Sequence, residues 1–184
     1  MKLPSTAKKI FSGVIFDVYQ WEQKMFDKST ATFEMLKRAN TLQVIATRGD
    51  KVLISYEEQP MKGKFHTLFG GRQEDDETPL AGIKREFLEE SGMVSDDWEL
   101  FKTCEPYCKV DWTIYTYIAR DCKKIQEVKN DPGEKTQTVE LNFDEFIALV
   151  SAKDFIGKEI TLEVLRLRVS GELEKFKKKI FNNT

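Results

Sequence analysis

GGRQEDDETPLAGIKREFLEESGM, residues 70–93, is the stretch that decides the fold. Its second half predicts a helix from Thr78 to Ser91, because Thr78 can cap the N-terminus and Pro79 suits the first turn. Apolar residues recur there at helical spacing, and Gly92 is placed to end the helix. Its first half is a glycine pair followed by an acidic loop, which brings exposed backbone and negative charge to the start of this helix.

Three glutamates of the predicted helix, Glu86, Glu89 and Glu90, are spaced so that they project from one face. Like charges at this spacing repel each other by a few tenths of a kcal/mol per pair, and a bound cation would turn that cost into a gain. Carboxylate oxygens are the ligands that hard cations such as Mg²⁺ prefer. Taken alone, the glutamates are better explained by a solvated acidic face, so the wider spacing has to decide between these interpretations.

The complete spacing resembles the Nudix box: glycine, five residues, glutamate, seven residues, Arg-Glu, a hydrophobic residue, any residue, Glu-Glu, any residue, glycine and a hydrophobic residue. Every glycine and charged position is present, at Gly71, Glu77, Arg85, Glu86, Glu89, Glu90 and Gly92. Phe87 replaces the smaller aliphatic residue that the family usually has, which requires only local repacking. The chain is therefore similar to the Nudix hydrolases, over the box and over most of the sequence after about Leu42.

The resemblance implies an α/β fold, namely a Nudix-type α/β/α sandwich with a mixed sheet, preceded by a small N-terminal antiparallel β-sheet. We expect residues 1–41 to be this β-strand extension and residues 42–184 to be the hydrolase domain. In the ADP-ribose and nucleotide-sugar pyrophosphatases, which the N-terminal strands resemble, the extra sheet helps to build a homodimer and the nucleotide pocket.

Residue patterns outside the box predict the other elements. We expect strands over Phe11 to Trp21, Thr30 to Lys37, Phe65 to Phe69, Trp98 to Cys104, Val110 to Ala119 and Thr136 to Leu141. Leu42 to Tyr56 is expected to form two strands that turn at Gly49-Asp50. The strand after Val110 is expected to carry on one face Trp112, Ile114, Thr116 and Ile118. Helices are expected over Phe143 to Val150 and along a stripe from Leu162 to Ile180 that Gly171 interrupts only mildly.

The resemblance also implies a divalent cation, Mg²⁺ or Mn²⁺, with specific ligands. Glu86 and Glu90 would be the leading ligands, Glu89 would be a further ligand or would hold a metal-bound water, and the carbonyl of Gly70 would also bind. Structural positions of the box would be Gly71, Glu77, Arg85 and Gly92. Glu134, which follows the loop at 130–133, is the candidate general base, and an ordinary turn glutamate is the alternative.

Substrate contacts are expected on both sides of the glycine pair. Arg72 and Lys64 flank it and are placed to bind phosphates. Trp21 or Phe33 could stack on a base, with core packing as the alternative for either ring. The resemblance implies hydrolysis of the diphosphate in ADP-ribose or a related nucleotide sugar. Residues 56–60, Tyr-Glu-Glu-Gln-Pro, replace an arginine-containing segment that is common in that branch.

Two other functions remain open at this point. One is pyrophosphohydrolysis of oxidised nucleoside triphosphates, which the extra N-terminal strands count against. The other, from a different class, is a catalytically silent nucleotide-binding module, although all the box glutamates are retained. Offering the protein a panel of nucleotides would separate these alternatives.

Composition narrows the partners and the compartment. The 184 residues carry a net charge of −2, which gives no basic field for nucleic acid, and no run is apolar enough to span a bilayer. The three cysteines match no zinc spacing and there is one histidine, so reduced structural thiols are expected. We see no secretory signal and expect a cytoplasmic protein that binds neither membrane nor nucleic acid.

Overall fold

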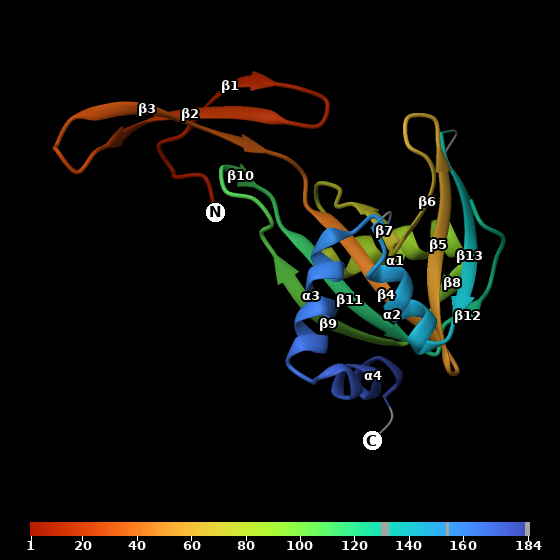
Figure 1. The fold of residues 1–184 in the computed structure, drawn as a ribbon. Coiled ribbons are helices and arrows are strands. Elements are labelled where there is room, and N and C mark those ends of the chain that lie inside the picture. The colour runs from red at the N-terminus through yellow and green to blue at the C-terminus, as the bar shows by residue number, and fades with distance from the viewer. Residues whose placement is uncertain (130–132, 154, 183–184) are drawn as a thin grey trace.

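The computed structural model describes residues 1–129, 133–153 and 155–182 (Figure 1). A central sheet lies among the helices, and a second sheet projects from it as an arm made mainly of the N-terminal strands (Figure 1). The turn predicted before Glu134 falls largely on Asn130, Asp131 and Pro132, which lie outside the described residues.

The central sheet has seven strands in the order β13-β5-β4-β11-β9, with β6 beside β5 and β7 beside β4. Their bounds are β4 Thr41–Arg48, β5 Lys51–Gln59, β6 Gly63–Thr67, β7 Phe69–Arg72, β9 Asp97–Cys104, β11 Ile114–Arg120 and β13 Lys135–Leu141. β11 runs parallel to β4, whereas the other pairs are antiparallel. The sheet is therefore mixed, as predicted.

Helices cover both faces of this sheet. They are α1 (Pro79–Ser91), α2 (Phe143–Val150), α3 (Lys158–Val169) and α4 (Leu173–Phe181). Side chains alternate between the faces along each strand, so Leu53 packs with Ile83 and Phe87 of α1, while the neighbouring Ile54 packs with residues of α2, α3 and α4. These two cores confirm the predicted α/β/α sandwich.

Helix α1 has the ends that its sequence predicts. Thr78 adopts an extended conformation and its side chain accepts a hydrogen bond from the backbone N–H of Ala81 at 3.2 Å. Gly92 has a left-handed φ of 69°, and its N–H donates to the carbonyl of Leu88 at 2.9 Å. With about 3.6 residues per turn, Glu90 lies on nearly the same side of α1 as the buried Ile83, and Glu86 lies beside it, so both glutamates face β7.

The projecting arm is a four-stranded sheet in the order β1-β2-β3-β10. Its strands are β1 Lys8–Ser12, β2 Asp17–Lys24, β3 Thr30–Lys37 and β10 Val110–Asp111. The first three strands are antiparallel, as predicted, whereas β10 joins β3 in parallel from a distant part of the sequence. A third, two-stranded sheet pairs β8 (Met93–Val94) with β12 (Lys123–Lys124). The division of the chain at residues 41 and 42 stays a prediction.

Two segments cross between the arm and the central sheet side by side. The N–H of Thr41 donates to the carbonyl of Thr113 at 3.0 Å, and the N–H of Thr113 donates to the Asn40 side chain at 3.0 Å. The indole N–H of Trp112 donates to the hydroxyl of Thr41 at 3.1 Å. The two crossings are thus hydrogen-bonded to each other.

Three predictions of continuous strands were wrong. Residues 11–21 turn at Gly13, whose N–H donates to the Phe16 carbonyl at 3.0 Å, and residues 65–69 break at Leu68 between β6 and β7. Residues 110–119 break at Trp112 and Thr113, because the first part pairs with the arm and the second with the central sheet. Trp112 therefore does not belong to the strand that contains Ile114, Thr116 and Ile118.

The predicted C-terminal stripe is two helices, α3 and α4. Gly171 adopts a left-handed φ of 73°, which ends the α-helical conformation where the sequence analysis expected only a mild interruption. Both helices still bury the apolar residues of the stripe, among them Val164 and Phe176. Within the described residues, none of the helices has the length and apolar character needed to cross a membrane.

Candidate functional site

Close packing against the box helix explains the glycine pair at the end of β7. The N–H of Gly70 donates to the Glu90 carboxylate at 2.8 Å. Gly70 has a φ of 147°, and a Cβ there would lie 2.0 Å from the carbonyl oxygen of Leu42. A Cβ on Gly71 would lie 2.5 Å from the Glu86 carboxyl carbon. Only glycine lets this backbone approach the two carboxylates so closely.

Arg85 holds the acidic loop to α1 through paired charges. Its guanidinium donates to Glu77 at 3.0 and 3.3 Å, to Glu86 at 3.0 Å and to Glu89 at 3.3 Å. These contacts raise the pKa of Arg85, mainly through Glu77, and the bond from Arg85 lowers the pKa of Glu77. The contact expected between Glu77 and Arg85 is present, while the structural role of this pair stays a prediction.

Glu90 lies in a different environment from Glu77. Burial raises the pKa of Glu90 well above its ordinary value, and the negative charge of Glu57 adds to this effect. Glu86 is intermediate, because burial raises its pKa while Arg85 opposes the shift. Of these carboxylates, Glu90 is therefore the one least compensated by positive charge.

The sequence analysis missed Glu57, which β5 places beside Glu90. Its side chain is 5% exposed, and it accepts hydrogen bonds from Ser55 at 2.9 Å and from Gln59 at 3.2 Å. Burial raises its pKa, and the nearby charge of Glu134 contributes. A signal was available, because strand alternation from Leu53 puts Ser55 and Glu57 on the face that α1 covers.

Glu134, the candidate base, lies beside the same cluster. One Glu134 oxygen accepts a hydrogen bond from the Gln59 side-chain amide at 2.8 Å, and the same amide nitrogen donates to Glu57. The charge of Glu134 also raises the pKa of Glu90. The structure therefore brings Glu134 close to the box glutamates, as a base for that site would require.

The donor set fits a hard divalent cation in its chemistry. Glu86, Glu89, Glu90 and the Gly70 carbonyl offer only oxygen ligands, which Mg²⁺ and Mn²⁺ accept. In the part of the chain that the structure describes, no three His, Cys, Asp or Glu side chains already stand together as a metal site. Arg85 pairs instead with Glu86 at 3.0 Å and with Glu89 at 3.3 Å.

A pair of arginines lies beside this site, between the arm and β7. The Arg38 guanidinium lies 4.6 Å from the ring centre of Trp112 and 5.6 Å from that of Phe16. Its Nε is buried and has no hydrogen-bond partner among the described residues. Burial and the neighbouring charge of Arg72 lower the pKa of Arg38. Sequence reasoning identified Arg72 but gave no signal for Arg38, whose setting depends on three distant segments.

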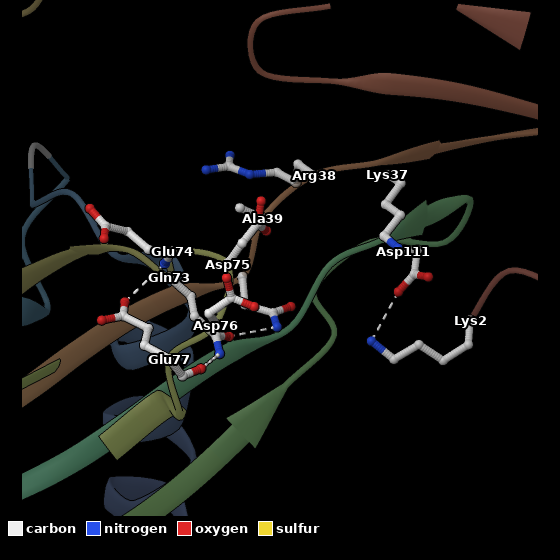
Figure 2. A pocket seen from close by; sticks show the side chains of 11 residues that line it. Lys2, Lys37, Arg38, Ala39, Gln73, Glu74, Asp75, Asp76, Glu77 and Asp111 are labelled. Carbon is white, nitrogen blue, oxygen red and sulfur yellow. Dashed lines mark hydrogen bonds and ion pairs between the residues drawn. The ribbon is translucent and has the colours of Figure 1, made fainter. Parts of the chain in front are cut away.

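Two cavities that share Arg38 in their walls make this region accessible to a ligand. Arg38 and Arg72 line a cavity of about 400 Å³ together with Lys9 and Lys37. Arg38 also lines a second cavity, of about 430 Å³, whose wall includes the box loop from Gln73 to Glu77 but not Glu86, Glu89 or Glu90 (Figure 2). In Figure 2 no dashed line reaches Arg38, whereas Glu77 is tied to the backbone of Glu74.

The remaining predicted substrate residues are more dispersed. Lys64 lies on β6 and lines a hollow of about 300 Å³ with Tyr56 and Glu57. Trp21 and Phe33 lie opposite each other in the arm with ring centres 6.0 Å apart, four positions farther out than the Asp17–Lys37 pair. Within one chain, Arg72 therefore belongs to the box segment, Lys64 shares a hollow with Glu57, and Trp21 lies farther out in the arm.

Comparison with known proteins identifies the fold and the family of the chain. The chain aligns with a solved structure described as the crystal structure of ADP compounds hydrolase, with a TM-score of 0.70 at 16% identity, over 91% of this chain and 95% of that one. Identity this low shows a shared fold. A comparison with curated protein sequences gives no match. The family model of the NUDIX domain matches residues 37–163, more than half of the chain, and the protein therefore belongs to the Nudix family.

Proposed function

We propose that the protein is a divalent-cation-dependent pyrophosphohydrolase acting on a nucleoside diphosphate joined to another group, with ADP-ribose or a related nucleotide sugar as its leading substrate. One observation carries the proposal: acidic side chains for a cation adjoin the segment from Gly70 to Arg72, and so do Arg38 and Arg72, which form no ion pair in the described part of the chain. A diphosphate needs both, because its oxygens bind a hard cation and pair with guanidinium groups.

The comparisons support the reaction class and the choice of substrate. The family match spans the box and the central sheet. The solved structure that shares the fold over 91% of this chain is described as an ADP compounds hydrolase. The arm also favours a nucleotide sugar over a free triphosphate, because the end of the arm nearest the central sheet forms one wall of the cavities beside Arg38.

Each box residue then has a defined task. Glu86 and Glu90 would hold Mg²⁺ or Mn²⁺ with the Gly70 carbonyl, and Glu89 would be a further ligand or would orient a water molecule. When bound, the cation supplies charge neutralisation of the phosphates and lowers the pKa of the attacking water. Glu134 accepts a proton from that water, and the P–O bond of the anhydride breaks as the new P–O bond forms.

Substrate binding is assigned to the basic side chains around the glycine pair. Arg72 and Arg38 bind the phosphates from the side of the arm, and Lys64 approaches from β6. Trp21 reaches a base only if it belongs to the arm of a second copy, since it lies away from the box in its own chain. This arrangement is consistent with the predicted homodimer.

Two further expectations belong to the same proposal. Exposed apolar side chains gather in the β1–β2 hairpin, including Phe11 at 59%, Val14 at 92% and Ile15 at 61% exposure, which supports a homodimer through the arm. We assign the protein to the cytoplasm, because its three cysteines are free and thiols persist in a reducing compartment.

A product assay tests the proposal. Purified protein with Mg²⁺ is offered ADP-ribose, UDP-glucose, GDP-mannose, a dinucleoside polyphosphate and 8-oxo-dGTP. Release of AMP and ribose 5-phosphate from ADP-ribose is expected. Pyrophosphate released from the triphosphate alone would replace the proposal with triphosphate hydrolysis. Cation-dependent nucleotide binding without any turnover would identify a silent binding module.

A further inference from the structure

Glu57 occupies a position that strand geometry would reserve for an apolar side chain. Leu53, Ser55 and Glu57 alternate along β5 on the face that α1 covers, and their exposures are 0%, 0% and 5%. Leu53 belongs to the apolar core under α1, whereas Glu57 continues the same row as an acid. Acidic side chains are almost never buried to this degree without a partner.

The partners that Glu57 has are neutral. Ser55 and Gln59 donate hydrogen bonds to its two carboxylate oxygens at 2.9 and 3.2 Å. Among the described residues no lysine or arginine forms an ion pair with it, and Lys62 acts only at longer range. The next residue provides a contrast, since the Glu58 side chain is 45% exposed and pairs with Lys135 at 3.6 Å.

The charge of Glu57 acts on Glu90, a partly buried side chain at the C-terminal end of α1 that carries no ion pair in the described part of the chain. Two carboxylates close together in a medium of low dielectric repel strongly, so the arrangement is favourable only when a positive charge joins it. Ser55 and Gln59 fix Glu57 in advance, which removes the cost of ordering it when that charge arrives.

We propose that Glu57 is a further ligand of the divalent cation, supplied by β5 from outside the box. The inference rests on the proposed function, because it adds a carboxylate to the cation site of Glu86 and Glu90. Its oxygens belong to the class that Mg²⁺ and Mn²⁺ bind. The Gln59 amide donates to both Glu57 and Glu134, so the same side chain holds this proposed ligand and the candidate base next to each other.

Binding of Mn²⁺ alone to the full-length, chelator-treated protein tests this inference by calorimetry and by electron paramagnetic resonance of free Mn²⁺. Glu57→Gln is expected to weaken Mn²⁺ binding at least about tenfold, because removal of one ligand charge from a cation site has effects of that order. Glu58→Gln is the matched control on the opposite face of the same strand, and its affinity should stay within about twofold of wild type, as for an exposed charge.

Wild-type Mn²⁺ affinity in Glu57→Gln would overturn the inference. Glu90→Gln then separates the two levels of the argument: if it loses Mn²⁺ while Glu57→Gln retains it, the box site stands and only the role of Glu57 fails. If both variants retain Mn²⁺, the proposed cation site itself is wrong. Circular dichroism monitors folding, and Glu57→Met, which has similar volume and no charge, provides the same test if the glutamine variant does not fold.

Discussion

Arg85 and Arg38 both adjoin the loop at 73–77, yet their surroundings are opposite. Arg85 contacts the carboxylates of Glu77, Glu86 and Glu89, and every one of these contacts lies within the box. Arg38 lies between two aromatic rings, next to another arginine, with its Nε unpartnered among the described residues. One arginine already has its anions, and the other is placed to receive one.

The carboxylates divide in the same way. Glu77 is held by Arg85 and has a lowered pKa, whereas desolvation and the charge of Glu57 raise the pKa of the partly buried Glu90. Paired charges stabilise the fold they belong to, and unpaired buried charges destabilise it unless a ligand compensates them. The comparison therefore separates Glu77, which Arg85 holds, from Glu90, a proposed cation ligand, whereas Glu86 and Glu89 contact Arg85 and are also proposed ligands.

The largest expected effect is on turnover. Glu90→Gln should lower kcat by about a thousandfold or more while the protein stays folded, since loss of a preorganised charged group at a reaction centre costs that much. Steady-state hydrolysis of ADP-ribose and circular dichroism measure the two quantities. Glu127→Gln changes a side chain that is 93% exposed and should be fully active. A fully active Glu90→Gln enzyme would remove Glu90 from the site.

Next in size is the effect of the paired arginine on stability. Arg85→Ala should lower the free energy of unfolding by about 2 kcal/mol, because Glu77 and Glu86 lose their shared partner in a partly buried network. Urea denaturation of the chelator-treated protein measures it. Arg38→Ala should leave this free energy unchanged or raise it. Equal destabilisation by both variants would break the comparison between the two arginines.

Arg38 should matter for the substrate instead. Arg38→Ala should lower kcat/KM for ADP-ribose by about ten- to a hundredfold, the value of a charged hydrogen bond to phosphate. Arg38→Lys should recover part of this loss. Lys177→Ala removes another cation over a ring, 5.3 Å from the centre of Phe143 on a distant helix, and serves as the control. Unchanged kcat/KM in Arg38→Ala would leave the arginine with a packing role only.

The smallest expected effect is on the free energy of unfolding, and its sign distinguishes Glu90 from Glu77. Without divalent cation, Glu90→Gln should raise the free energy of unfolding by about 1 kcal/mol, because functional charges are often held at the expense of stability. Glu77→Gln should lower it by a similar amount, since it removes a partner of Arg85. Denaturation curves in chelator compare the two. Shifts of the same sign would mean that pairing does not distinguish these carboxylates.

Local signals account for what the sequence predicts well. Thr78, Pro79 and Gly92 set the ends of α1 through their own backbone preferences, and Gly49-Asp50 forms the β4–β5 turn. The box spacing then determines which helix face carries the glutamates. The break at Trp112 has no such local cause, because the alternating pattern continues through it and only pairing with two different sheets interrupts the strand.

The candidate site likewise contains contacts that local sequence predicts and environments that it does not. Contacts within the box, such as Glu77 with Arg85 and Gly70 with Glu90, follow from short-range spacing. Glu57 reads in the sequence as the polar end of a strand, and its burial depends on a helix that begins more than twenty residues later. Arg38 depends on rings from two other segments. Long-range packing decides these environments, and one sequence carries little direct record of it.

The two crossing segments, residues 38–40 and 111–113, hold the arm in a fixed orientation relative to the central sheet. A single connection would let it swivel, whereas two connections bonded along their length resist both bending and twisting. Deletion of residues 1–36 would remove Leu36, which pairs with Val110 and donates its N–H to the Lys109 carbonyl at 3.0 Å, and would leave that carbonyl to water. Such a shortened protein would keep Arg38 in its sequence but lose Phe16, one of the two rings that hold it.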